Sequence, residues 1–310
     1  MRYLVTGGAG FIGSHVSNRL IERGDEVVVF DDMSRGDKSR LRPEAIIRPF
    51  NIANYEALLA EAKDVDFILH FAASVGVKRC MDNLPATISN NVSATKTVAQ
   101  TASILKKPLF FASTSEVYGM GTSTVFSEGD RLLFGDPEET RWIYSQTKVM
   151  GESLLHHFKR HSGLDFIIAR FFNTVGPGQN TGYGAVMPTL VKQARGGDDL
   201  TVFGTGNQIR SFCYITDVVD AILALIDQRL FGEVYNIGNP QPTTISELAN
   251  LIVRESGSSS QIKYIPYSEA YGDGFAEVPI RVPDISKINS HTGWSPKVGL
   301  PEIIERMING

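Results

Sequence analysis

Residues 6–13 read Thr-Gly-Gly-Ala-Gly-Phe-Ile-Gly and come directly after the apolar stretch 2–5. Three of the glycines are spaced three residues apart, and a helical pattern, Phe11–Arg23, begins inside the motif. Glycine is needed where a turn is tight, where the backbone approaches a pyrophosphate, and where a helix packs closely on a strand. The N–H groups and dipole at the start of the helix favour phosphate charge. The stretch therefore predicts a strand, a turn and a helix that bind a dinucleotide.

An acidic residue supports this interpretation. Asp31 directly follows the apolar run Glu26–Phe30, about 20 residues beyond the glycines, as a dinucleotide fingerprint requires. A carboxylate at this point accepts hydrogen bonds from the adenosine ribose and repels a 2′-phosphate. The sequence therefore favours NAD over NADP as the cofactor.

The rest of the chain alternates short β-branched runs with helical patterns, which is typical of a parallel sheet covered on both faces. The expected strands are Tyr3–Thr6, Glu26–Phe30, Ala45–Arg48, Asp66–His70, Leu109–Ser113 and Asp165–Arg170. The expected helices are Phe11–Arg23, Ala86–Leu105, Tyr144–His161, Val186–Arg195, Asp217–Gln228, Ser246–Ser256 and Leu300–Ile308. We therefore predict an α/β fold, a Rossmann-type doubly wound parallel sheet with a smaller C-terminal α/β substrate domain.

The predicted domains are residues 1–172, which bind NAD, and residues 173–310, which bind the substrate, interleaved around 210–236. The boundary follows from the segment 173–184, whose Gly, Pro, Asn and Thr content predicts a loop ordered by its ligand. We expect the chain to return to the first domain after this loop.

Composition excludes several classes of protein. The 310 residues carry a net charge of −4, which argues against a nucleic-acid surface. The apolar runs are too short to span a membrane, and the N-terminus lacks the pattern of a signal peptide. Cys80 and Cys213 are far apart and form neither a disulfide framework nor a metal-ligand spacing, so we expect two buried thiols, no metal site and a cytoplasmic protein.

Six segments, in the same order along the chain, resemble motifs of the extended short-chain dehydrogenase/reductases, the nucleotide-sugar epimerase/dehydratase family. In addition to the glycine turn they are His70–Ala73, Asn91-Val92, Ala112–Gly119, Tyr144–Lys148, Arg170–Pro177 and Arg210–Asp217. Together they cover nearly the whole chain. The resemblance implies an NAD-dependent enzyme that oxidises the sugar of a nucleotide-sugar to a 4-keto intermediate, and the expected nucleotide-sugar is UDP-linked.

Tyr144 and Lys148 lie four residues apart on an expected helix and therefore share one face. A tyrosine has an ordinary pKa near 10, and we expect the ammonium of Lys148 and the positive nicotinamide to lower the pKa of Tyr144. Tyr144 then takes a proton from a sugar hydroxyl while hydride leaves the same carbon. Thr114, at the carboxyl end of a strand, is expected to bridge the substrate and Tyr144.

The resemblance also implies the remaining site residues. The expected cofactor-binding residues are Gly7, Gly10, Phe11, Ile12, Gly13, Asp31, Asp32, Asn51, Ile52, Phe71, Ala72, Ala73, Asn91, Tyr144, Lys148 and Phe171. The expected substrate-binding residues are Thr114, Asn173, Arg210 and Arg281, with Arg210 on the diphosphate. The helices at 86–105 and 144–161 resemble those that form a four-helix homodimer interface in the family.

Glu116 bears on the type of reaction. A simple 4-epimerase needs no second carboxylate, whereas Thr114-Ser115-Glu116 resembles UDP-glucuronate decarboxylases, and in sugar 4,6-dehydratases a glutamate removes the C5 proton. Arg281 precedes Pro283-Asp284 as in the decarboxylases and could pair with a carboxylate. A UDP-glucuronate decarboxylase is the leading hypothesis. The alternatives are a UDP-sugar 4-epimerase, a 4,6-dehydratase, and a non-catalytic relative that only senses NAD or acts as a scaffold.

Overall fold

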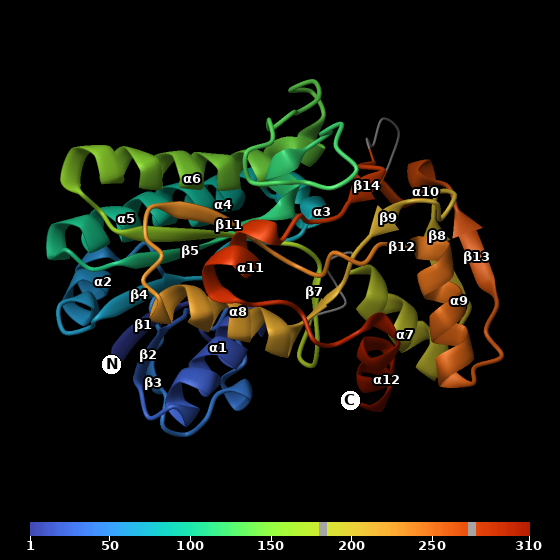
Figure 1. The fold of residues 1–310 in the computed structure, drawn as a ribbon, viewed down its shortest axis with the longest axis horizontal. Coiled ribbons are helices and arrows are strands. Elements are labelled where there is room, and N and C mark those ends of the chain that lie inside the picture. The colour runs from blue at the N-terminus through green and yellow to red at the C-terminus, as the bar shows by residue number, and fades with distance from the viewer. Residues whose placement is uncertain (180–184, 272–276) are drawn as a thin grey trace.

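The computed structural model describes residues 1–179, 185–271 and 277–310, so residues 180–184 of the expected loop lie outside the described residues. Seven parallel strands form the central sheet, in the order β11-β6-β5-β4-β1-β2-β3 (Figure 1). Their bounds are β1 Arg2–Thr6, β2 Glu26–Phe30, β3 Ile46–Arg48, β4 Phe67–His70, β5 Leu109–Thr114, β6 Phe166–Phe171 and β11 Glu233–Ile237.

The order of the strands reverses between β1 and β4, because the chain runs outward through β2 and β3 and then returns to the other side of β1. In open α/β sheets a ligand binds outside the carboxyl ends of the strands at such a reversal. Most side chains of these strands are buried, as expected of a parallel sheet that is covered on both faces.

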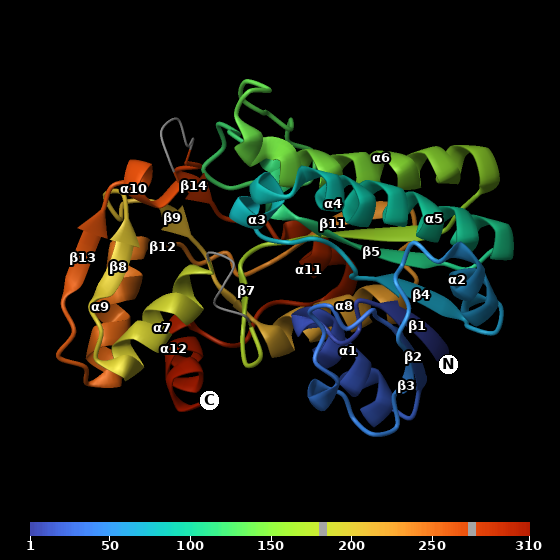
Figure 2. The same ribbon diagram turned by 180° about the vertical axis from the view of Figure 1, so that it is seen from behind.

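Helices cover both faces of the sheet (Figures 1 and 2). One face carries α2 Tyr55–Ala62, α5 Ala94–Leu105 and α6 Ile143–Ser162. The other face carries α1 Phe11–Glu22, α8 Ile215–Asp227 and α11 Ser286–Thr292. The predicted Rossmann-type α/β fold is therefore confirmed.

The remaining elements lie beside the carboxyl ends of the strands, on the right of Figure 1. The strands there are β7 Thr174–Val175, β8 Leu200–Phe203, β9 Ile209–Arg210, β10 Cys213–Tyr214, β12 Thr243–Thr244, β13 Ile262–Ile265 and β14 Ile280–Arg281. The helices are α7 Val186–Gly196, α9 Ile245–Ser256, α10 Tyr267–Tyr271 and α12 Leu300–Asn309. A capping box in which Thr244 and Glu247 exchange hydrogen bonds fixes the start of α9.

The expected helix 86–105 is confirmed, with one local distortion that the sequence did not predict. After α3 Val77–Asp82, helix α4 Leu84–Ile88 runs directly into a π-helical turn, Ser89–Ser93, and then into α5. Within that turn, the amide of Asn91 accepts a hydrogen bond from the Ser74 N–H (2.7 Å) and donates one to the Ser74 carbonyl (3.0 Å). A π-turn often marks a functional position in a helix, and here it brings a buried amide against the loop after β4.

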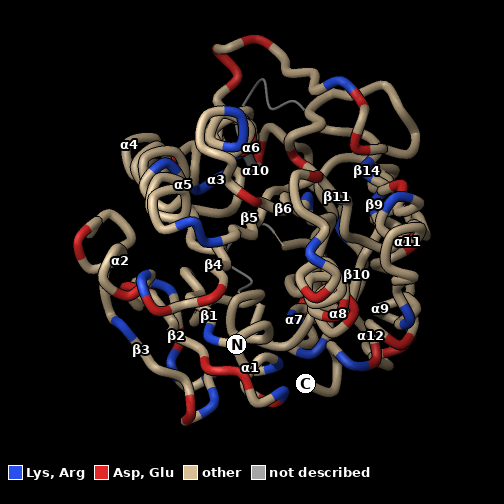
Figure 3. The backbone as a smooth tube through the Cα atoms, turned by 60° about the vertical axis from the view of Figure 1, so that its left-hand side comes forward, with Lys and Arg blue, Asp and Glu red and all other residues tan. Residues whose placement is uncertain are grey.

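Acidic and basic residues are interspersed along the chain, as Figure 3 shows. Two pairs join α1 to α8, namely Arg19 with Asp220 at 2.9 Å and Arg23 with Asp227 at 2.9 Å. Within the described ranges, none of the helices combines the length and apolarity needed to cross a bilayer.

His70 ends β4 inside the core, with its ring between two threonine hydroxyls. Nδ1 lies 2.7 Å from Thr6 Oγ1, and Nε2 lies 3.0 Å from Thr95 Oγ1. Burial, together with the charge of Lys148, lowers the pKa of His70 to about 3. In the unfolded chain a histidine has an ordinary pKa of about 6.5. Between about pH 6.5 and pH 3 the folded protein therefore keeps this ring neutral, whereas the unfolded chain protonates it.

We expect His70 to make the fold acid-sensitive. The pKa of His70 is lower in the folded protein than in the unfolded chain. Its contribution to the unfolding free energy is therefore fully present above about pH 6.5 and is lost as the pH falls toward 3. Between pH 7 and pH 5 the wild-type protein should lose about 2 kcal/mol of unfolding free energy through this group. Urea denaturation at both pH values, compared with His70→Asn, measures the effect. The variant should be less stable at pH 7 but should lose less on acidification, and equal losses would contradict the prediction.

Candidate active site

The glycine turn lies against the end of β4. Gly7 has φ +68°, a conformation that glycine adopts freely, and a Cβ there would lie 2.6 Å from the Ala72 N atom. A Cβ on Gly13 would lie 2.2 Å from the Gly7 carbonyl oxygen. The backbone of the turn therefore packs without side chains between α1 and the segment Phe71–Ala73, directly before the first turn of α1. This cradle fits the pyrophosphate of a dinucleotide.

Asp31 is buried directly after β2, where it binds the glycine turn and the loop that follows β2. Its carboxylate accepts hydrogen bonds from Ala9 N and Met33 N, both at 3.0 Å. Burial raises the pKa of Asp31, and the two backbone hydrogen bonds oppose this effect. A carboxylate oxygen has more than one acceptor site, so these bonds leave Asp31 able to accept from a ribose.

The other residues expected near the adenine occupy different environments. Asp32 is exposed and accepts hydrogen bonds from Ser34 N (3.0 Å) and from the Asn51 amide (2.8 Å). Ile52 packs in the apolar core on the α5 side of the sheet. Phe11 and Ile12 are half-buried at the start of α1, and Phe71 and Phe171 both contact Phe110 with ring centroids 5.6 and 6.4 Å apart.

Replacing Gly13 by Ala should weaken both the fold and NAD binding. The new methyl group meets the backbone of residues 7 and 8, which cannot move aside as a side chain can. We expect a loss of about 1–3 kcal/mol in unfolding free energy, measured by urea denaturation, and at least a tenfold (about 1.4 kcal/mol) loss in NAD affinity, measured by calorimetry.

Gly10→Ala is the matched control, because a Cβ on Gly10 meets the same Gly7 oxygen only at 3.1 Å. This variant should weaken NAD binding while the stability stays close to that of the wild type. An equal loss of stability in both variants would contradict the role given to the close packing at residue 13.

Thr114, Tyr144 and Lys148 meet at the carboxyl end of β5. Thr114 ends the strand and caps the short helix η3, Ser115–Tyr118, by accepting a hydrogen bond from Glu116 N (3.2 Å). Tyr144 and Lys148 lie one turn apart near the start of α6, and both are buried. Ser115 is also buried, so the segment expected to act on the substrate is fixed by the fold.

The protein alone does not lower the pKa of Tyr144, contrary to our expectation. Burial, together with the charges of Cys80 and Glu116, raises the pKa, against the hydrogen bond with Thr114 and the charge of Arg281. The ammonium of Lys148 donates a hydrogen bond to the Ala112 carbonyl at 2.8 Å. Since burial outweighs the protein's own cations, the positive nicotinamide is the remaining group that favours the phenolate.

Lys148 is held in a confined site. Burial lowers the pKa of Lys148 to about 8, against the charges of Cys80 and Glu152. Its Nζ lies 4.9 Å from the centre of the Phe111 ring. Asn91 also reaches this helix, because its Nδ2 donates to Thr147 Oγ1 at 3.1 Å. The polar atoms of Asn91 are thus bound within the protein, where they join the loop after β4 to the helix that carries Tyr144 and Lys148.

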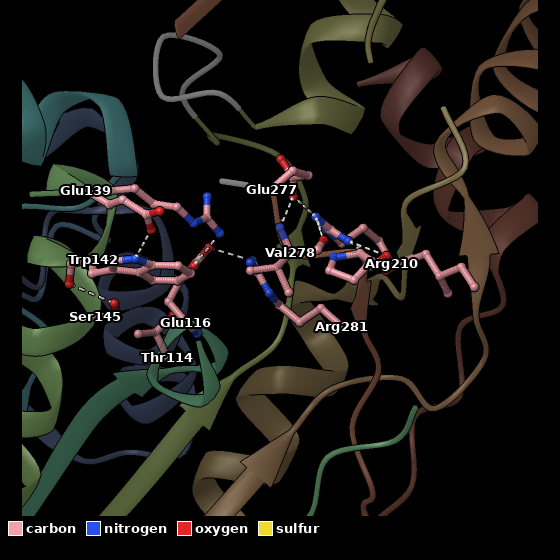
Figure 4. Close-up of polar contacts among 12 residues, drawn as sticks. Thr114, Glu116, Glu139, Trp142, Ser145, Arg210, Glu277, Val278 and Arg281 are labelled. Atoms are coloured by element: carbon pink, nitrogen blue, oxygen red, sulfur yellow. Dashed lines mark hydrogen bonds and ion pairs between the residues drawn. The ribbon is translucent and has the colours of Figure 1, made fainter. Parts of the chain in front are cut away.

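Glu116 lies between two arginines that come from different parts of the chain (Figure 4). Its Oε1 accepts from Arg281 of β14 at 2.5 Å, and its Oε2 accepts from Arg141 of the short helix η4, Thr140–Trp142, at 3.4 Å. Burial would raise the pKa of Glu116, but Arg281, Arg141 and Arg210 together hold it below its ordinary value. The site therefore contains an ionised carboxylate and an excess of positive charge beside Thr114.

The two other expected substrate residues are tied to the backbone. Arg210 of β9 donates to the Val278 carbonyl at 2.8 Å and pairs closely with Glu277 (Figure 4). The amide of Asn173 donates to the Ser211 carbonyl at 2.9 Å. The structure thus places Arg210 beside the same group of charged side chains, but with a carboxylate already against its guanidinium.

Sequence reasoning missed Arg141 and Glu277. Arg141 stands three residues before Tyr144, and its turn is fixed by a hydrogen bond from Trp142 Nε1 to Glu139 (2.6 Å). A charged residue directly before the Tyr144 helix was an available signal. Glu277 follows residues outside the described ranges, and no sequence pattern marks its pairing with Arg210.

Cys80 and Cys213 are both buried with free thiols, as expected. Among the described residues, His, Cys, Asp and Glu side chains do not gather into a group of three that could hold a metal ion. The described side chains at the site offer a phenol, an ammonium, a hydroxyl, a carboxylate and guanidinium groups.

Comparison with known proteins agrees with this geometry. Residues 3–238 match the family model described as the NAD dependent epimerase/dehydratase family. The chain is 38% identical to UDP-N-acetyl-alpha-D-glucosaminuronate decarboxylase of Bacillus cytotoxicus, over 98% of this chain and 97% of that protein. It is 34% identical to UDP-glucuronic acid decarboxylase 1 of Arabidopsis thaliana, over 100% of this chain and 69% of that protein.

Solved structures show the same likeness. UDP-glucose 4-epimerase of Thermotoga maritima with UDP-glucose superposes with a TM-score of 0.89 at 27% identity, covering 100% of this chain and 98% of that one. UDP-glucuronic acid 4-epimerase of Bacillus cereus, in complex with UDP-glucuronic acid and NAD, gives a TM-score of 0.88 at 27% identity with the same coverage. The chain is thus an enzyme that belongs to the NAD-dependent epimerase/dehydratase family.

Proposed function

We propose that this enzyme decarboxylates a UDP-linked hexuronic acid through a 4-keto intermediate. The observation that carries the proposal is the cluster of Glu116 with Arg281 and Arg141 beside Thr114. Two buried arginines offer more positive charge than one glutamate neutralises, so the cluster can still receive the carboxylate of a uronic acid. The names of the related decarboxylases support the same reaction.

The side chains divide the chemistry between them. Tyr144, hydrogen-bonded to Thr114, is proposed to take the proton of the sugar O4 hydroxyl, and Lys148 to hold a cofactor ribose beside it. NAD, when bound, supplies the acceptor for the hydride that leaves C4. The sugar carboxylate is then β to the new ketone, so the bond to C5 breaks, CO₂ leaves and the electron pair moves onto the ketone oxygen. Proton uptake at C5 and return of hydride and proton to C4 and O4 complete the cycle without net oxidation.

Arg281 and Glu116 are proposed to act on the carboxylate. The fork of Arg281 can hold a carboxylate in a fixed plane. Glu116, kept ionised by its arginine neighbours, places a like charge beside it, and loss of CO₂ relieves that repulsion. Gly7, Gly10 and Gly13 are proposed to hold the pyrophosphate of NAD, Asp31 the ribose, and Arg210 and Asn173 the nucleotide part of the substrate.

The test is a product analysis. Purified protein is incubated with NAD and either UDP-glucuronate or UDP-N-acetylglucosaminuronate, and the products are weighed by mass spectrometry. Loss of one CO₂ from either substrate supports the proposal and identifies the sugar. Unchanged mass with an inverted C4 in the NMR spectrum would instead identify a 4-epimerase, and no product from either sugar would contradict the proposal.

We also propose the division into an NAD-binding unit, residues 1–172, and a substrate-binding unit, residues 173–310, interleaved around 210–236. The support is that β11 pairs with β6 at the edge of the large sheet, after the excursion through α7, β8 and β9. The free thiols Cys80 and Cys213 support the proposal of a cytoplasmic, reducing environment.

We further propose a homodimer that forms through α4, α5 and α6, which lie side by side (Figures 1 and 2). Exposed apolar side chains project from these helices: Ile88 is 46%, Met150 50% and Ile104 56% exposed. We propose that these exposed apolar side chains contribute to the interface, since interaction sites are often apolar.

Sedimentation equilibrium at micromolar concentration should give twice the monomer mass of 34.0 kDa. Met150→Glu should shift the protein toward the monomer, because a charge would enter the apolar interface. Tyr264→Glu, at a 53% exposed residue on β13, is the control and should leave the mass unchanged. A monomeric wild-type protein, or a dimeric Met150→Glu variant, would contradict the proposal.

A further inference from the structure

A buried charged cluster lies directly beneath the site. Ser113, Glu152 and Arg170 are 4%, 5% and 5% exposed and come from β5, α6 and β6. Glu152 accepts hydrogen bonds from Ser113 Oγ (2.5 Å), Arg170 Nε (3.0 Å) and Arg170 Nη2 (2.7 Å). Removing a charge from water is costly unless it is paired, and here Arg170 pairs the carboxylate of Glu152.

The cluster joins the two elements that carry the reactive groups. Glu152 follows Lys148 by one helical turn, and Ser113 directly precedes Thr114. Lys148 donates to the carbonyl of Ala112 at 2.8 Å, while Glu152 holds the next residue of the strand, Ser113. Two consecutive residues of β5 are therefore bound by two consecutive turns of α6, which fixes the helix along the strand.

Arg170 makes the carboxylate a rigid part of this arrangement. It also donates to the Glu128 carbonyl at 3.2 Å, and its guanidinium carbon lies 4.9 Å from the centre of the Tyr118 ring. Tyr118 in turn donates to Asn236 of β11 at 2.7 Å. Glu152 is thus anchored from β6 and, through Tyr118, from β11, so its charge has a fixed place relative to Lys148.

The ionisable groups around Lys148 are few. Besides Tyr144 on its own helix, they are Cys80 of α3, His70 of β4 and Glu152. Burial lowers the pKa of Lys148, whereas Cys80 and Glu152 raise it. Since burial also raises the pKa of the Cys80 thiol, that group is neutral near neutral pH. Glu152 is then the one of these neighbours that supplies negative charge.

We infer that Glu152 is a positioning residue for the hydride-transfer chemistry. It holds Lys148 and Tyr144 in register with Thr114, and its charge keeps Lys148 in the ammonium form that binds the cofactor ribose. The inference rests on the proposed roles of Tyr144 and Lys148 and adds a residue that does not itself touch the substrate. A merely structural Glu152 would affect stability but not the pH at which Lys148 loses its proton.

The experiment compares pH profiles of Glu152→Gln, Glu152→Asp and Ser113→Ala with that of the wild-type protein. The glutamine keeps the shape and the hydrogen-bonding oxygen but removes the charge. We expect the alkaline limb of kcat to move down by about one pH unit in Glu152→Gln, and to return toward the wild-type position in Glu152→Asp. Ser113→Ala should lower kcat but leave the alkaline limb at the wild-type pH. This variant loses the hydrogen bond to Glu152, whereas the charge of Glu152 remains.

Calorimetric NAD binding as a function of pH gives a second readout that needs no turnover. Its alkaline limb should move in the same direction in Glu152→Gln, so the inference can be judged even if wild-type turnover, and with it the proposed function, fails. If Glu152→Gln does not fold because Arg170 is left unpaired, Glu152→Gln/Arg170→Gln removes both charges and should show a smaller shift of the same sign. If the alkaline limbs of kcat and of NAD binding stay at the wild-type pH in every folded variant, the inference is wrong.

Discussion

Replacing Tyr144 by Phe is expected to lower kcat by about two to four orders of magnitude while the affinity for NAD changes little. The variant removes only the hydroxyl that is proposed to accept and return the O4 proton, and the buried ring keeps its packing. Initial rates on the sugar that the wild-type protein accepts, together with NAD calorimetry, separate the loss of chemistry from a loss of binding.

Tyr264→Phe, at an exposed phenol on β13, is the matched control and should retain wild-type turnover. If Tyr144→Phe also retained it, the catalytic assignment would be wrong. The remaining polar groups near the sugar, Thr114 and Glu116, would then have to be tested as the base.

Replacing Arg281 by Lys should reduce kcat/KM for a UDP-uronate by about thirtyfold to a thousandfold, equivalent to roughly 2–4 kcal/mol. Lysine keeps the charge but lacks the planar fork, so it cannot hold Glu116 and a substrate carboxylate together. The affinity for NAD should stay near that of the wild type, since Arg281 belongs to β14, which lies outside the seven-stranded sheet that carries the glycine turn.

The control for this substitution is Arg254→Lys, at an arginine that pairs with Glu255 at the surface and is 68% exposed. It should behave like the wild-type protein, because exposed pairs contribute little. Steady-state kinetics with UDP-glucuronate, together with calorimetric affinities for UDP-glucuronate and for UDP-glucose, make the test specific. If Arg281→Lys lost as much affinity for UDP-glucose as for UDP-glucuronate, Arg281 would not be the residue that recognises the carboxylate.

Local signals were predictable from the sequence. The glycine turn, Asp31 and the pair Tyr144 and Lys148 each depend on residues close together in the chain, and the structure places all of them at the carboxyl edge of the sheet. Six strands of the large sheet were also expected from the alternation of strands and helices, whereas β11 was not predicted.

Pairings between distant residues were not predictable. Glu116 and Arg281 are separated by 165 positions in the chain, and Arg210 and Glu277 by 67. No single-sequence pattern states which carboxylate an arginine will meet, so Arg141 and Glu277 were missed. The pKa of Tyr144 was misjudged for a related reason: the desolvation of a side chain depends on everything packed around it, and here burial outweighs the nearby cations.

The place of β11 in the large sheet limits how this protein can be divided. A fragment that ends at residue 172 would leave β6 with an unpaired edge, because the partner of Phe166–Phe171 is Glu233–Ile237. Such an edge invites pairing with other chains, and α1 would lose the ion pairs from Arg19 and Arg23 to α8 as well. Swapping sugar specificity between relatives therefore requires exchanging separate stretches on either side of α8 and β11, and a single crossover point will not produce a working chimera.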